Sequence, residues 1–133
     1  MQPGRELWRF AVVGALGFVI DAALFVLLND AYDWPIRNAR ALSTVCAITA
    51  TWALNRRLTF AGRSSRLWAA ELARYAFFQC VGLVVNVGTF ALVLWAVQPL
   101  RTVPIVALAL GSGVAMLFNF WTARTLAFRP DRA

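Results

Sequence analysis

Two long apolar stretches of this chain end on arginine at comparable positions, WALNRRLTF (52–60) and FWTARTLAF (120–128). Arginine presents a planar fork of N–H donors that can hold a phosphate through two parallel hydrogen bonds. A single arginine here would only anchor a helix at the interface, but the recurrence indicates that Arg56 and Arg124 flank one central site. Phosphate at a bilayer surface means a lipid headgroup. The candidate phosphate ligands are Arg56, Arg57, Arg124, Asn55 and Arg9.

Asp21 lies about 12 residues into the first apolar stretch, roughly 18 Å at 1.5 Å per residue, near or past the middle of a bilayer. An ionised carboxylate there costs about 2.5–3.5 kcal/mol, so it should face the interior of a helix bundle. Gly14 and Gly17 share its face. The third apolar stretch repeats the spacing with Gln79, Gly82 and Asn86. Two interpretations stay open: close helix packing through glycine with interhelical hydrogen bonds, or a hydrophilic site.

The second apolar stretch carries a polar stripe on a narrow helical arc, and the fourth carries a patchier counterpart, Ser112 and Asn119. The stripe consists of Arg37, Arg40, Thr44, Thr51 and Asn55. Either its arginines snorkel to the outer surface, or the stripe is a track for a charged headgroup, with Arg40 receiving the phosphate near the outer face. The residues predicted to line this path are Asp21, Asn86, Thr51, Asn119, Arg40 and Gln79.

Composition indicates what must position these residues. The 133-residue chain is 61% hydrophobic, 14% charged and has no histidine, whereas soluble domains average about 25% charged residues. Four segments have the roughly 20 apolar residues that a membrane span needs. They are residues 9–29, 37–57, 74–97 and 103–124. Backbone groups must be satisfied within the bilayer and no barrel-like alternation is present, so we predict an all-α membrane protein with one domain, residues 1–133.

All thirteen basic residues are arginine, and their placement predicts the orientation. Ten fall at the N-terminus, the middle linker and the C-terminus: Arg5, Arg9, Arg56, Arg57, Arg63, Arg66, Arg74, Arg124, Arg129 and Arg132. Three fall in the other loops: Arg37, Arg40 and Arg101. Both termini should therefore be cytoplasmic. A nucleic-acid partner is not expected, because the arginines lie between apolar runs rather than on an amphipathic face.

The sequence also repeats itself. Residues 6–28 match 71–93 at a shift of 65, with eight identities in 23 positions, and Asp21 aligns with Asn86. The later segments align at a shift of 68, which pairs Arg56 with Arg124. We therefore predict two helical hairpins of the same orientation, repeat one 6–60 and repeat two 71–128, related by a pseudo-twofold axis along the membrane normal.

These features resemble the GtrA-like family of small four-helix membrane proteins, over nearly the whole chain. The resemblance rests on RFAVVGALGFVIDAALFVLL, WALNRRLTF and NFWTARTLAF. Its motifs are Arg9-Phe10 with Gly14, Asn55-Arg56 with Thr59-Phe60, and Asn119-Phe120 with Arg124. The chain departs from the pattern at Leu58, where an aromatic residue is usual, and at Ala123, where asparagine is common.

The resemblance implies a role in cell-surface polysaccharide synthesis. The leading hypothesis is a flippase that moves a polyprenyl-phosphate-linked monosaccharide, such as undecaprenyl-phosphate glucose, across the bacterial inner membrane. The alternative is a non-transporting adaptor that recruits a glycosyltransferase through the basic linker 62–74. A small multidrug-type exporter using Asp21 is disfavoured, because its cationic substrates would meet a stripe of arginine.

No acid–base pair, metal cluster or activated nucleophile is visible, so an enzyme, a cofactor and a metal are not expected. Four helices leave little room to enclose a headgroup, which favours a homodimer. Small residues recur on one face of the last apolar segment at Ala107, Gly111 and Ala115. They form either that dimer interface or an internal contact.

Overall fold

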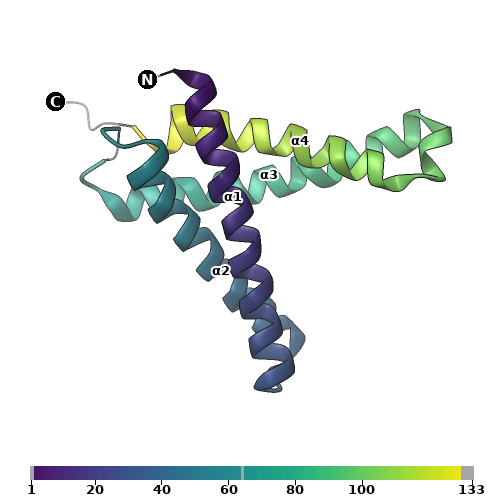
Figure 1. Cartoon of the computed structure of the whole chain (residues 1–133), viewed down its shortest axis with the longest axis horizontal. Helices are drawn as coiled ribbons and strands as arrows, with labels where there is room; N and C mark the ends of the chain where they lie inside the picture. Colours follow the sequence, from purple (N-terminus) through teal and green to yellow (C-terminus); the bar gives the residue numbers. More distant parts are fainter. Residues whose placement is uncertain (1, 64, 130–133) are drawn as a thin grey trace. The chain divides into compact units, whose positions relative to one another are not determined.

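The computed structural model describes residues 2–63 and 65–129, and all secondary structure in them is helical (Figure 1). The long helices are α1 (Pro3–Val26), α2 (Ile36–Leu54), α3 (Trp68–Ala96) and α4 (Pro104–Thr122). Three short π-helical turns follow α1, α2 and α4: η1 (Leu27–Ala31), η2 (Asn55–Thr59) and η4 (Ala123–Ala127). A 3₁₀ turn, η3 (Gln98–Arg101), precedes α4. The chain divides at residues 68 and 69 into two compact units, which we call the first and second hairpins.

Proline sets where two of the helices begin. Pro3 and Pro104 are the first residues of α1 and α4, a position where the missing N–H removes no helical hydrogen bond. Both α1 and α3 begin about six residues before the predicted spans, and the first turns of both helices bury a glutamate, Glu6 or Glu71. No separate helix interrupts the described part of the linker before α3.

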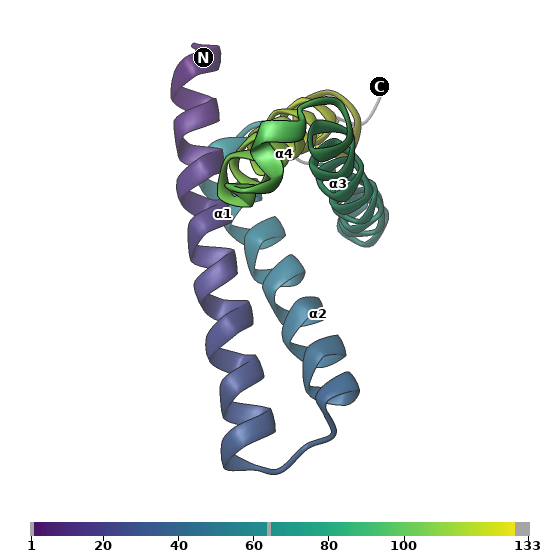
Figure 2. The same ribbon diagram turned by 90° about the vertical axis from the view of Figure 1, so that its right-hand side faces the viewer.

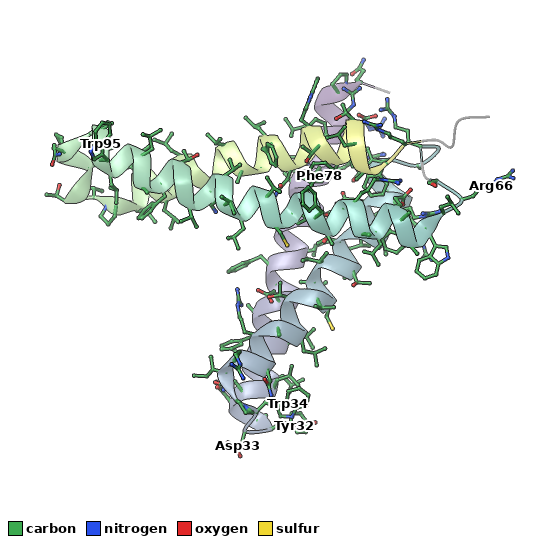
Figure 3. The ribbon with its side chains drawn as sticks, turned by 180° about the vertical axis from the view of Figure 1, so that it is seen from behind. Tyr32, Asp33, Trp34, Arg66, Phe78 and Trp95 are labelled. Atoms are coloured by element: carbon green, nitrogen blue, oxygen red, sulfur yellow. The ribbon has the colours of Figure 1, made fainter. Side chains whose placement is uncertain are left out.

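In the first hairpin, α1 and α2 run antiparallel and side by side (Figures 1 and 2). They touch closely where Gly17 meets the methyl group of Thr51. At the open end, the rings of Phe10 and Phe60 lie 6.2 Å apart and both residues are buried. The tip is the turn at Asp33, whose φ of 51° is a left-handed conformation that Asp tolerates, flanked by Tyr32 and Trp34 (Figure 3).

The second hairpin makes the corresponding contacts at the aligned positions. Gly82 faces Asn119, and the rings of Tyr75 and Phe128 lie 5.7 Å apart. Gly111 faces Asn86, so the small-residue face of α4 is an internal contact between α3 and α4. The connection 97–103 is three residues longer than its counterpart 32–35, which accounts for the change of shift from 65 to 68. The two hairpins therefore share these contacts, while their common orientation and the pseudo-twofold axis stay a prediction.

Three stretches of the described chain are long and apolar enough to cross a membrane: Pro3–Ala31, Trp68–Ala96 and Pro104–Ala127. Many large apolar side chains on them are exposed, as lipid-facing residues would be. Tryptophan lies at the tip of each hairpin, Trp34 in one and Trp95 in the other (Figure 3), where amphipathic rings suit a membrane interface. The 19-residue α2 is the exception, because its first turns hold Arg37, Asn38 and Arg40, so the four-span count stays a prediction.

Candidate functional site

An ion pair bridges the two helices of the first hairpin. Asp21 lies five residues before the end of α1, and Arg40 is the fifth residue of α2. Nη1 of Arg40 lies 2.8 Å from Oδ2 of Asp21. The hydroxyl of Ser43 donates to Oδ1 of Asp21 at 2.7 Å, and that of Thr44 at 3.3 Å. Both carboxylate oxygens are therefore occupied by donors from α2.

The environment of this cluster is asymmetric. The Asp21 side chain is 16% exposed and that of Arg40 is 58% exposed, so the guanidinium reaches inward from the rim of the hairpin. It also lies 5.8 Å from the centre of the Phe25 ring, a cation–π distance. Charged groups within an apolar hairpin are costly unless paired, and here the carboxylate has three partners. For Arg40 to take a phosphate, it must exchange Asp21 for the new anion.

The motif at the end of α2 folds as the π-helical turn η2. Phe60 N–H donates to the carbonyl of Asn55 at 2.8 Å, and Thr59 Oγ1 donates to Oδ1 of Asn55 at 2.8 Å. Asn55 and Thr59 are both buried. π-Helical turns are uncommon and occur often at functional sites. The turn thus gives residues 55–59 a fixed, polar interior.

The arginines of this turn point in different directions. Arg56 is half-buried; its Nη2 donates to the carbonyl of Ser65 at 2.9 Å, and its guanidinium lies 5.6 Å from the ring of Trp52. Arg57 is exposed. Arg9 of α1 donates from Nη1 to the carbonyl of Leu58 at 2.9 Å. The structure therefore gathers Arg9, Arg56 and Asn55 around one turn, with Arg57 on its outer face.

The second hairpin holds the remaining predicted residues. Its α4 also ends in a π-helical turn, with Phe128 N–H donating to the carbonyl of Ala123 at 2.9 Å. Arg124 lies half-buried in that turn. Gln79 Nε2 donates to the hydroxyl of Tyr75 at 2.7 Å, while Asn119 packs on Gly82 and Asn86 on Gly111. The amides of Asn86 and Asn119 therefore lie between α3 and α4.

Comparison with known protein families decides what this helical framework is. The model of the GtrA/DPMS transmembrane domain matches residues 9–132. The chain belongs to this family. No solved structure matches the chain. As a GtrA/DPMS member, the chain is a membrane protein. Membership suggests involvement in the handling of polyprenyl-phosphate-linked sugars. Proteins of this family are generally non-catalytic.

The geometry of this GtrA/DPMS chain brings together residues that sequence reasoning had linked only loosely. Asp21 was grouped with Gly14 and Gly17, but Gly14 is exposed with nothing near it, and Asp21 instead pairs with Arg40 of α2. Thr51 contacts Gly17 rather than a polar partner on α1. The polar stripe of α2 is thus split between an ion pair near the tip and a turn at the open end.

Three further residues were missed in this GtrA/DPMS chain. Ser43, fully buried, makes the shorter hydroxyl bond to Asp21; its signal was its place three residues after Arg40. Glu6 and Glu71 are 2% and 0% exposed, and their signal was identity at the start of both repeats. Within the described residues, no group of three or more His, Cys, Asp or Glu side chains is arranged to hold a metal ion.

Proposed function

We propose that this protein flips a polyprenyl-phosphate-linked monosaccharide, such as undecaprenyl-phosphate glucose, across the bacterial inner membrane. The observation that carries the proposal is the cluster of Asp21, Arg40, Ser43 and Thr44 inside an apolar hairpin of a polyprenyl-phosphate-sugar family. Helix packing alone does not require this cluster, because the second hairpin meets the same need with Asn86 on Gly111.

The first step is docking of the phosphate at the cytoplasmic face. Arg56 takes it, assisted by Arg57 and Arg124, while Asn55 and Arg9 hold the turn that presents Arg56. A guanidinium fork matches two phosphate oxygens, and such charge-assisted bonds contribute about 1.5–3 kcal/mol each. Arg56 already donates to the Ser65 carbonyl through Nη2, so a phosphate that took this N–H group would have to replace that bond.

The second step moves the headgroup past Asp21. Sugar hydroxyls are donors of the same kind as those of Ser43 and Thr44, so they can replace these hydroxyls on Oδ1 of Asp21. The phosphate then competes with Asp21 for Arg40 near the outer face, and the prenyl chain stays in lipid. Asn86, Thr51, Asn119 and Gln79 supply further polar contacts along the path. A homodimer would provide the remaining enclosure.

The test is lipid flipping by the purified protein in liposomes, combined with native mass spectrometry of bound lipid. Arg56→Ala should lower the flipping rate and the retention of undecaprenyl-phosphate glucose by about tenfold or more, which corresponds to the loss of one charge-assisted contact. Arg56→Lys should restore only part, because lysine lacks the fork. Arg5→Ala, which removes an exposed arginine from the first turn of α1, serves as the control.

Two results would contradict the proposal. Normal flipping by Arg56→Ala would remove the phosphate site. A wild-type protein that retains no lipid but co-purifies with a glycosyltransferase, and that loses this partner when the linker 62–74 is exchanged, would make the protein an adaptor.

A further inference from the structure

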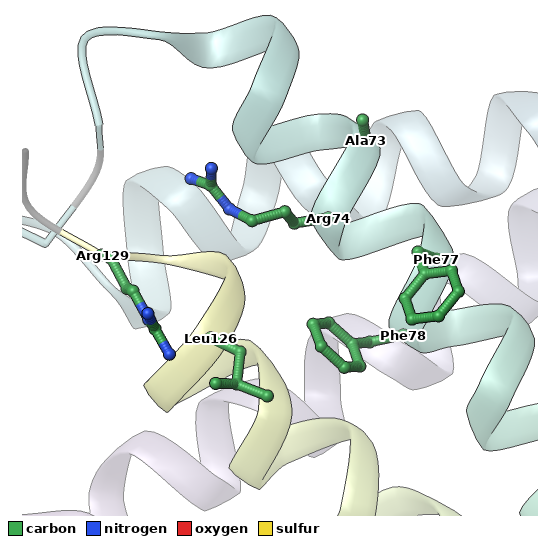
Figure 4. A pocket seen from close by; sticks show the side chains of 6 residues that line it. All are labelled: Ala73, Arg74, Phe77, Phe78, Leu126 and Arg129. Carbon is green, nitrogen blue, oxygen red and sulfur yellow. The ribbon is translucent and has the colours of Figure 1, made fainter.

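A groove on the second hairpin has a lining unlike that of the predicted path. It lies between the start of α3 and the end of the chain's last turn and has a volume of about 450 Å³ (Figure 4). Its lining residues are Ala73, Arg74, Phe77, Phe78, Leu126 and Arg129. The two guanidinium groups lie toward one end, and the rings of Phe77 and Phe78 lie toward the other.

Both arginines retain hydrogen-bonding capacity. Arg74 donates from Nη2 to the carbonyl of Ala127 at 3.3 Å, while its Nε is buried and has no hydrogen-bond partner in the described part of the chain. Arg129 donates from Nε to the carbonyl of Thr125 at 2.6 Å, so this bond does not use the N–H groups of its Nη1 and Nη2 atoms. A guanidinium carries five N–H donors, so an anion can bind both without breaking either bond.

The apolar end is suited to a hydrocarbon chain. Phe77 and Phe78 pack edge to face with ring centres 5.3 Å apart, and Phe77 is 62% exposed. Leu126 completes this surface from the last turn. A ligand that fits both ends therefore has an anionic head and an apolar tail, and the groove lies in the first turns of a membrane-spanning helix, where lipid headgroups are found.

We propose that this groove binds a polyprenyl phosphate that carries no sugar, an inference that rests on the proposed function. The lining has two cations but no carboxylate, hydroxyl or amide side chain with which to recognise a sugar. A phosphate monoester carries close to two negative charges near neutral pH, against one for the sugar-linked diester, so two guanidinium groups match the monoester. The unloaded carrier is what delivery of a sugar leaves behind, and the groove retains it for the next cycle.

The test counts lipids on the intact protein by native mass spectrometry in nanodiscs of uncharged lipid. Undecaprenyl-phosphate glucose is supplied at saturation, and undecaprenyl phosphate is then titrated. Wild type should bind one of each per chain. Arg129→Gln should weaken binding of undecaprenyl phosphate by about tenfold, since one charge-assisted contact is lost, and leave the glucosylated lipid within about twofold. Arg74→Gln should act alike, and Arg5→Gln should change neither.

Arg129 is exposed, so its substitution keeps the test valid even if Arg74→Gln unfolds the hairpin by losing the bond to Ala127. Equal displacement by phosphatidic acid would make the groove a general phospholipid site and overturn the proposal, as would undecaprenyl phosphate binding unchanged in Arg129→Gln. The two proposals separate cleanly. If wild type binds the glucosylated lipid alone, the groove assignment fails; if it binds undecaprenyl phosphate alone, the flippase proposal fails.

Discussion

Asp21 in the first hairpin and Asn86 in the second occupy aligned positions but meet different partners. Asp21 meets a guanidinium and two hydroxyl groups of α2, whereas Asn86 lies against Gly111, with no side chain between them. The aligned partners explain the contrast: Ser43 corresponds to Gly111, and Arg40 corresponds to Leu108. At these aligned positions the first hairpin is joined by charge and hydrogen bonds, and the second by close approach of its helices.

The same contrast recurs at the other end of each hairpin. The first π-helical turn buries the Thr59–Asn55 hydrogen bond, and the second buries Ala123 and Ala127 at these positions. Both turns nevertheless meet an aromatic ring and an arginine from the first helix of their own hairpin, Arg9 of α1 or Arg74 of α3. The framework is thus shared, while polar chemistry is concentrated in the first hairpin.

The largest effect is expected at the close contact in the second hairpin. A methyl group on Gly111 would lie 2.8 Å from the carbonyl oxygen of Asn86, a backbone atom that cannot rotate away. Gly111→Ala should therefore destabilise the protein by about 2–3 kcal/mol, measured by thermal unfolding in detergent. Gly113→Ala, where nothing lies within 4 Å, is the control and should be neutral or stabilising. Gly17→Ala should lower the free energy of unfolding by less than Gly111→Ala, because the added methyl group would meet only the Thr51 side chain. Equal losses would contradict the difference between the two hairpins.

An intermediate effect is expected from the ion pair. Asp21→Leu leaves the Arg40 guanidinium without its carboxylate. It should lower the free energy of unfolding by roughly 1–2 kcal/mol, between the values for exposed and buried pairs, and should abolish flipping. Asp21→Asn keeps an acceptor for Ser43 and should hurt less in both assays. Asp21→Leu combined with Arg40→Leu should recover stability but not flipping. If the double variant recovered both stability and flipping, the cluster would serve only to pack the helices. The same conclusion would follow if both Asp21 variants flipped lipid at the wild-type rate.

The smallest effect is expected within the π-helical turn. Thr59→Val removes the hydroxyl bond to Asn55 at nearly constant shape and should cost about 1 kcal/mol of unfolding free energy. Ala127→Ser, the aligned change in the second turn, should not gain stability, because Ala123 offers no side-chain acceptor there. A stabilised Ala127→Ser protein would mean that the two turns have more similar interiors than their sequences indicate.

Much of the framework was predictable from sequence because it follows from periodicity. The four long helices and the glycine contacts at Gly17 and Gly82 follow from apolar length and helical spacing. The family and its membrane character follow from motifs in order along the chain.

The remaining features depend on how two helices meet. Spacing places Gly14 on the same face as Asp21 but cannot say which turn the partner helix touches, and the structure leaves Gly14 open. The pairing of Asp21 with Arg40 requires the register that the connection 32–35 imposes. The π-helical turns have no compositional signature, and the buried glutamates of the first turns resemble solvated residues in sequence.

The π-helical turns η2 and η4 each change the phase of the helix that they end. An α-helix advances about 100° per residue, so one extra residue in a turn rotates everything beyond it by about that angle. The rotation turns Phe60 toward α1 and Phe128 toward α3, where each ring meets its aromatic partner, Phe10 or Tyr75. The number of residues in each of these five-residue segments therefore matters more for the position of the aromatic ring than the identity of their side chains does. A one-residue deletion would turn the terminal ring out of its hairpin, although it removed no polar contact of its own.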